Sequence, residues 1–89
     1  MNFITGDNSI IYKEDGKILA QIDFPSCGDN IVNICHTQVD KAAQGRGLAA
    51  ELVKQAAEEL RRTGRKAELS CSYAIKWFRE HPGYEDILI

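Results

Sequence analysis

The sequence predicts one small α/β domain of the α+β kind, built on a mixed sheet of about four strands. Residues before position 40 are rich in β-branched and apolar side chains, with turn signals between the runs. From position 47 the spacing of apolar residues changes to that of a helix, and a short strand and a short helix follow. The expected order of elements is therefore β-β-β-α-β-α, with the first helix crossing between two strands of the sheet.

Three strands are expected before the first helix. Residues 9–13 and 17–24 are the first two, and the dipeptide Asp15-Gly16 between them is a strong hairpin signal. A second turn cluster at residues 25–30 leads into residues 31–39, which are the longest strand candidate. Apolar residues on both faces of this third strand indicate that it lies in the centre of the sheet.

Regular alternation along the third strand sets which side chains share a face. His36 is expected on the same face as Val32 and Ile34, because successive side chains of a strand point to opposite sides. Cys35 is expected on the opposite face, in the core.

The first helix is expected to begin after Gly47 and to stop at Gly64. Its apolar residues fall on one face at helical spacing, namely Leu48, Ala49, Leu52, Val53, Ala56 and Leu60. Residues 66–70 then form a strand, and residues 72–80 form a short helix that ends at His81-Pro82. A helix between two strands of one sheet makes those strands parallel.

Length, charge and cysteine content exclude several classes of protein. The 89 residues fit one domain, residues 1–89, and a net charge of −2 gives no basic footprint for nucleic acid. We expect no membrane association, since no apolar run approaches the roughly 20 residues of a span and no signal peptide is evident. Three widely spaced cysteines without a CxxC pair favour reduced thiols in the cytoplasm and no metal site.

Two glycines, Gly45 and Gly47, stand where the first helix must begin, although glycine is among the poorest helix formers. A helix N-terminus presents unpaired N–H groups that hold anions, above all phosphate, and glycine leaves those groups accessible. Arg46 between them is a candidate cation beside such a phosphate. The alternative is a loop that needs glycine for its backbone conformation alone.

Two nucleotide-binding patterns do not fit this segment. Residues 45–50 match G-x-G-x-x-A, but five residues separate the glycine from the strand and only about 40 residues follow, too few for a second βαβ half. A P-loop is excluded because no G-K-[ST] is present. A third pattern fits: Gln44-x-x-Gly47-x-Ala49 resembles the pyrophosphate-binding motif of GCN5-related N-acetyltransferases.

Further stretches of the chain carry the same resemblance. Ala74, Phe78 and Gly83-Tyr84 are similar to the family's later pattern, with Cys71 where that pattern usually has asparagine. Across residues 31–88, four stretches resemble the short, single-domain N-acetyltransferase-like subfamily, namely HTQV, the glycine loop, CSY and HPGY. The resemblance implies a minimal version of the acetyltransferase fold, in which acetyl-coenzyme A lies in the gap between two central parallel strands that splay apart.

The resemblance also implies a set of site residues. Main-chain groups of the third strand would contact the pantetheine of coenzyme A, and the glycine loop would hold its pyrophosphate. The cofactor-binding set is Ile34, Thr37, Val39, Gln44, Gly45, Arg46, Gly47, Leu48, Ala49 and Cys71.

Three residues are candidates for catalysis. Cys71 follows a strand and precedes a helix, where the helix dipole favours a thiolate that could accept the acetyl group or relay a proton. The alternative is a small thiol that fills the core. His36 is a candidate base and otherwise a structural histidine, while Tyr84 is a candidate acid or a packing residue.

The sequence thus favours an acetyl-coenzyme A-dependent N-acetyltransferase, with a protein or small-molecule amine as acceptor. The alternative is a non-catalytic acyl-coenzyme A-binding or regulatory module. Larger relatives place helices between their first two strands, whereas only EDGK joins them here, which predicts an open acceptor site. We expect a monomer or a weak homodimer.

Overall fold

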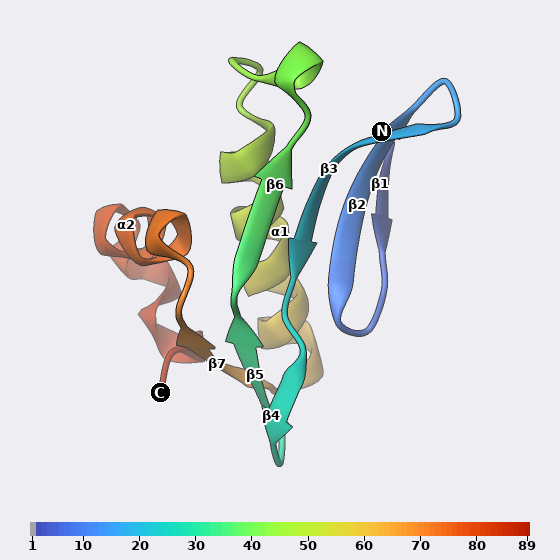
Figure 1. Ribbon diagram of the computed structural model, residues 1–89. Helices are drawn as coiled ribbons and strands as arrows, with labels where there is room; N and C mark the ends of the chain where they lie inside the picture. Colours follow the sequence, from blue (N-terminus) through green and yellow to red (C-terminus); the bar gives the residue numbers. More distant parts are fainter. Residues whose placement is uncertain (1) are drawn as a thin grey trace.

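The computed structural model describes residues 2–89 as two sheets, with helix α1 behind them and helix α2 to one side (Figure 1). The strands are β1 (Phe3–Thr5), β2 (Ser9–Glu14), β3 (Lys17–Asp23), β4 (Ser26–Gly28), β5 (Ile31–Ile34), β6 (His36–Val39) and β7 (Lys66–Leu69). The helices are α1 (Leu48–Thr63) and α2 (Ser72–Glu80), with short 3-10 helices η1 (Lys41–Ala43) and η2 (Pro82–Ile87).

The first sheet has the strand order β1-β2-β3-β6, and all of its pairings are antiparallel. The predicted hairpin at Asp15-Gly16 is confirmed, with positive φ at both residues, which the twist of a two-residue hairpin favours. The pairing of β2 with β3 shifts beside this turn, since Tyr12 faces Ala20 while Lys13 faces Ile18. Leu19 is therefore an extra residue that bulges out of β3.

The second sheet has the order β4-β5-β7, with β5 and β7 parallel and α1 in the connection between β5 and β7. This confirms the predicted parallel strands on either side of a helix. The prediction of one continuous strand over residues 31–39 was wrong, because the chain changes sheet at Cys35. Two short strands, β1 and β4, were not predicted; each has only three residues, too few for a pattern of period two to be recognised.

The change of sheet at Cys35 also reverses the faces of the residues that follow. Val32 and Ile34 are buried as expected, but beyond Cys35 it is Thr37 and Val39 that are half-buried. His36 is exposed, so the prediction that it shares a face with Val32 and Ile34 was wrong. Cys35 is exposed as well and does not lie in the core. A single irregular residue shifts an alternation of period two by one position, which moves every later side chain to the other face.

Helix α1 lies between two glycines in the left-handed conformation, Gly47 with φ 74° and Gly64 with φ 72°. Its apolar face meets both sheets, and Leu52, Val53 and Leu60 are fully buried there. Helix α2 buries Ala74, Trp77 and Phe78. No helix within residues 2–89 is long and apolar enough to cross a membrane.

Candidate coenzyme-binding site

The site begins where β6 and β7 separate. Strand β7 pairs with β5 as far as Ile34↔Leu69, and the amides of Ser70 and Cys71 then both donate to the carbonyl of Ile34, at 3.1 Å each. Strand β6 is the outermost strand of the first sheet, so one of its edges has no partner strand within the described residues. The two strands thus splay apart beyond Ile34, and the free edge of β6 faces the opening.

A hollow of about 400 Å³ lies beside β6 and the start of α1. This volume is within the usual range for small-molecule sites. Most of the residues predicted to bind the coenzyme line it together, namely Thr37, Val39, Gln44, Gly45, Gly47, Leu48 and Ala49. Ile34 is fully buried where the splay begins.

The glycine loop leaves the first amides of α1 without helical partners. The first hydrogen bond into the helix is donated by the amide of Glu51 to the carbonyl of Gly47, and no side chain of Gly47 exists to cap the helix. The positive φ of Gly45 (85°) and Gly47 (74°) gives a conformational reason for glycine at both positions. A Cβ at either position would meet no atom within 4 Å, so the space in front of these amides is open. The conformational explanation for the two glycines is therefore confirmed, while phosphate binding stays a prediction that the open space allows.

Cys71 does not line the hollow itself but contacts Thr37, which does. It is half-buried at the N-cap of α2, and its side chain caps no helical amide. Its Sγ lies 3.7 Å from Oγ1 of Thr37 on β6. The fold thus brings Cys71 and Thr37 together from segments 34 residues apart in the sequence.

Arg46 turns away from the hollow. Its guanidinium pairs with Glu14, at 2.6 Å between Nη2 and Oε2, and donates to the hydroxyl of Tyr12 at 3.1 Å. The pairing with Glu14 raises the pKa of Arg46 and lowers that of Glu14. Gln44 donates from Nε2 to the carbonyl of Val39 at 3.5 Å, across the start of the loop.

The structure places the other two catalytic candidates elsewhere. His36 is exposed, with Nε2 at 3.1 Å from Oε1 of Gln38. The hydroxyl of Tyr84 donates to Oε2 of Glu58 on α1 at 2.9 Å, and this hydrogen bond is the main cause that raises the pKa of Tyr84. Tyr84 borders a second hollow, which shares only Gly47 and Ala50 with the first.

Sequence reasoning missed three lining residues: Ala43, Ala50 and Tyr73. Tyr73 is 39% exposed, and partial burial raises its pKa. The signal that could have found it is its place two residues after Cys71, within the same CSY stretch. Among residues 2–89, no three His, Cys, Asp or Glu side chains are grouped to hold a metal ion.

The splay between β6 and β7 and the start of α1 at Gly47 place this chain in the acetyltransferase fold class. The sequence profile described as GCN5-related N-acetyl-transferase matches residues 9–87. The chain therefore belongs to the GCN5-related N-acetyltransferase family.

Known relatives agree with this assignment. Protein NATD1 of Homo sapiens is 40% identical over 55 residues, which are 62% of this chain and 49% of NATD1. The chain thus spans about half the length of the curated relatives it matches. The solution structure of a GCN5-like protein from Staphylococcus aureus superposes with a TM-score of 0.74 at 28% identity, over 98% of this chain and 86% of that one. A family acetyltransferase from Brucella melitensis in complex with acetyl-CoA shares the fold, with a TM-score of 0.64 at 24% identity over 81% of this chain and 49% of that one.

Proposed function

We propose that this protein binds acetyl-coenzyme A in the hollow beside β6 and transfers the acetyl group to an amine. The observation that carries the proposal is the convergence of three features on one hollow. These are the unpaired edge of β6, the glycine-capped start of α1, and the contact between Cys71 and Thr37. A fold neighbour, the enzyme from Brucella melitensis, was solved with acetyl-CoA.

The residues around the hollow fit acetyl-coenzyme A. The open amides from Gly45 to Ala49 would hold the pyrophosphate at the positive end of α1. The free main-chain groups of β6, beside Thr37 and Val39, would pair with the amides of the pantetheine arm as a neighbouring strand would.

Acetyl-coenzyme A supplies an acetyl group activated as a thioester. Direct transfer needs a group that takes the proton of the attacking amine and returns one to the coenzyme thiolate, and Cys71, in contact with Thr37 at the hollow, is our candidate for this relay. On the covalent route, the Cys71 thiolate attacks the thioester carbonyl and the coenzyme leaves as a thiolate. The amine then attacks the acetyl-cysteine, and the Cys71 sulfur leaves in turn.

Binding is tested by thermal unfolding with coenzyme A and with acetyl-coenzyme A. A ligand at 100 times its dissociation constant stabilises the folded state by about 2.7 kcal/mol, which is readily visible as a shift in Tm for a domain of this size. Folded protein whose Tm is unchanged at millimolar coenzyme would contradict the proposal.

The second candidate is a module that binds acyl-coenzyme A without turnover. The placement of two catalytic candidates favours it, since Tyr84 hydrogen-bonds to Glu58 and His36 is exposed. Incubation with acetyl-coenzyme A and a panel of amines separates the two functions. Acetylated amine found by mass spectrometry supports the enzyme, while tight binding without product supports the binding module.

A further inference from the structure

We propose that the hairpin of β2 and β3 clamps both ends of the loop over residues 40–47 and holds the glycine loop within it in the conformation that binds the coenzyme. Glu14 and Tyr12 are then positioning residues for the coenzyme, although neither lines the hollow that would hold it. This inference rests on the proposed function, since it names what prepares the same site.

The first anchor holds the end of the loop that enters α1. Arg46 lies between the two glycines, and its guanidinium reaches Glu14 at 2.6 Å and the hydroxyl of Tyr12 at 3.1 Å. The Tyr12 hydroxyl in turn donates to Glu14 at 2.5 Å, which closes a triangle of charge-assisted hydrogen bonds. The backbone between Gly45 and Gly47 is thereby tied to the last residue of β2.

The partners in this triangle are themselves held in place. Tyr12 is only 9% exposed, and its ring packs against Phe3 with centroids 4.8 Å apart. Glu14 lies two residues later on the same face of β2, so both side chains reach toward Arg46 together. The anchor is therefore built on a strand in the centre of the first sheet rather than on another loop.

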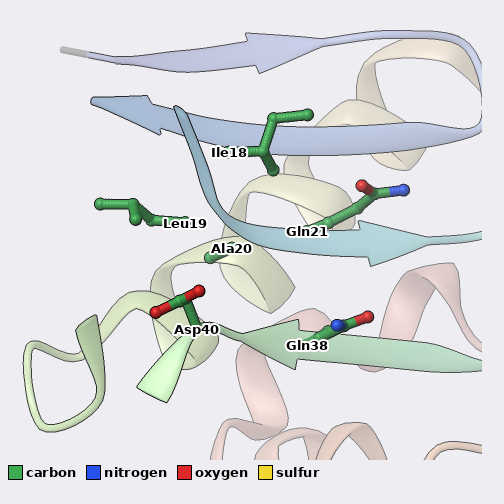
Figure 2. A pocket seen from close by; sticks show the side chains of 6 residues that line it. All are labelled: Ile18, Leu19, Ala20, Gln21, Gln38 and Asp40. Atoms are coloured by element: carbon green, nitrogen blue, oxygen red, sulfur yellow. The ribbon is translucent and has the colours of Figure 1, made fainter. Parts of the chain in front are cut away.

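The second anchor holds the end of the loop that leaves β6. The carbonyl of Leu19 accepts a hydrogen bond of 2.7 Å from the amide of Asp40, which extends the pairing of β3 with β6 by one residue beyond Ala20↔Val39. Lys17 lies 3.8 Å from the Asp40 carboxylate, which also accepts from the amide of Ala42 at 2.9 Å. Figure 2 shows Leu19 and Asp40 on the rim of a small hollow at this end of the sheet.

Both anchors come from one hairpin, on either side of the turn at Asp15-Gly16. A loop that contains two glycines has many conformations available to it, and fixing it before the ligand arrives lowers the entropic cost of binding. The hairpin fixes the conformation of the glycine loop, because Gly45 and Gly47 have no side chains that could do so.

Glu14→Gln tests the inference, with Glu59→Gln as its matched control. Glu59 also pairs with an arginine, Arg62, at 2.7 Å, but this pair lies within α1 and neither residue lines the hollow. Amide hydrogen exchange is measured without ligand at Glu51, whose amide donates to the carbonyl of Gly47 at 3.1 Å at the end of the loop, and coenzyme A affinity is measured by calorimetry. Tyr12→Phe, which keeps the ring that packs on Phe3, serves as a second and milder variant.

Glu14→Gln should accelerate exchange at the amide of Glu51 and weaken coenzyme A binding by about three- to five-fold, the scale of one exposed ion pair. Tyr12→Phe should act in the same direction, and Glu59→Gln should change neither quantity. Unchanged exchange and affinity in Glu14→Gln would overturn the clamp. Tighter binding would overturn it too, since Glu14 would then be competing with the phosphates for Arg46. Absence of coenzyme binding in the unmodified protein would contradict the proposed function instead, and the exchange measurement would still test the clamp.

Discussion

Gly47 and Gly64 form a matched pair at the two ends of α1. Both have φ near the left-handed value, 74° and 72°, and a Cβ at either position would meet no atom within 4 Å. Alanine at either position should therefore cost a similar amount of stability, about 1–2 kcal/mol, through the backbone alone. Only Gly47→Ala should also weaken coenzyme A binding, because only Gly47 lines the hollow.

Denaturant unfolding and calorimetric titration of the two variants measure these quantities. Gly64→Ala is the control for the backbone cost. Equal coenzyme affinity in the two variants would mean that Gly47 serves the backbone conformation and nothing else.

The three thiols offer a second prediction at the level of the residue. Cys27 and Cys35 are exposed and Cys71 is half-buried, so access alone predicts that Cys71 reacts most slowly. At Cys27 the chemistry acts in the opposite direction, since desolvation and the neighbouring Glu68 raise the pKa of that thiol and leave less of the reactive thiolate. We expect Cys71 to be alkylated fastest and to be protected by coenzyme A.

Peptide mass spectrometry after timed alkylation, with and without coenzyme A, gives the rate for each cysteine. Cys27 and Cys35 provide the exposed comparison within the same sample. A rate at Cys71 that is no higher than theirs, or that ignores saturating coenzyme, removes Cys71 from the proposed chemistry.

Among the elements, the helices could be predicted from sequence more closely than the strands. The bounds of α1 follow from Gly47 and Gly64, and those of α2 from Cys71 and His81, because each helix end is marked by a residue with a local conformational role. The break at Cys35 has no such mark. It depends on which strands lie beside residues 31–39, and pairing partners are decided by tertiary structure.

The same contrast applies to the candidate site. The glycine loop could be predicted because its motif is continuous in sequence, whereas the splay was expected only from the family resemblance. The pairing of Arg46 with Glu14 and of Tyr84 with Glu58 could not, because each joins distant segments and no periodicity records it.

Element η2 is joined to α1 through Tyr84. Its hydroxyl donates to Glu58, and Arg61 lies over its ring at 4.8 Å. Tyr84→Phe should therefore lower the stability of the domain by about 0.5–1 kcal/mol, the usual net value of one hydrogen bond. It should leave acetyl transfer within about two-fold of the unmodified protein, since the hydroxyl already has a partner on α1.

Chemical denaturation and steady-state rates with saturating acetyl-coenzyme A check both parts of this expectation. A loss of rate of a hundred-fold or more, with unchanged coenzyme affinity, would restore Tyr84 as the acid, because general acid catalysis contributes on that scale.

At the scale of the whole molecule, ion pairs between arginines and carboxylates determine how the folding stability changes at acid pH. Three carboxyl groups accept hydrogen bonds from arginine, which lowers the pKa of each: Glu14 from Arg46, Glu59 from Arg62 and Asp86 from Arg61. A carboxyl whose pKa is lower in the folded state contributes stability above its unfolded pKa, which is about 4. That contribution is lost as the pH falls through the folded value.

Tm should therefore be nearly constant from neutral pH to about pH 5 and should decrease below about pH 4. The decrease should be smaller in high salt, since the pairs of Glu14 and Asp86 lie at the surface where ions screen them. A Tm that stays constant to pH 2 would show that the arginine pairs contribute nothing to folding.

The irregular residue at Cys35 has a consequence for how such chains can vary. It decides whether odd-numbered or even-numbered residues of β6 face the hollow, and in this protein Thr37 and Val39 do. Deleting one residue there would exchange the two sets and turn His36 and Gln38 toward the ligand, with no change in the composition of the strand. Substitutions in β6 can accumulate one at a time, but a change of length at its start replaces all the side chains that β6 contributes to the hollow in one event. We expect the number of residues between β5 and β6 to vary less among related sequences than the identity of any residue within β6.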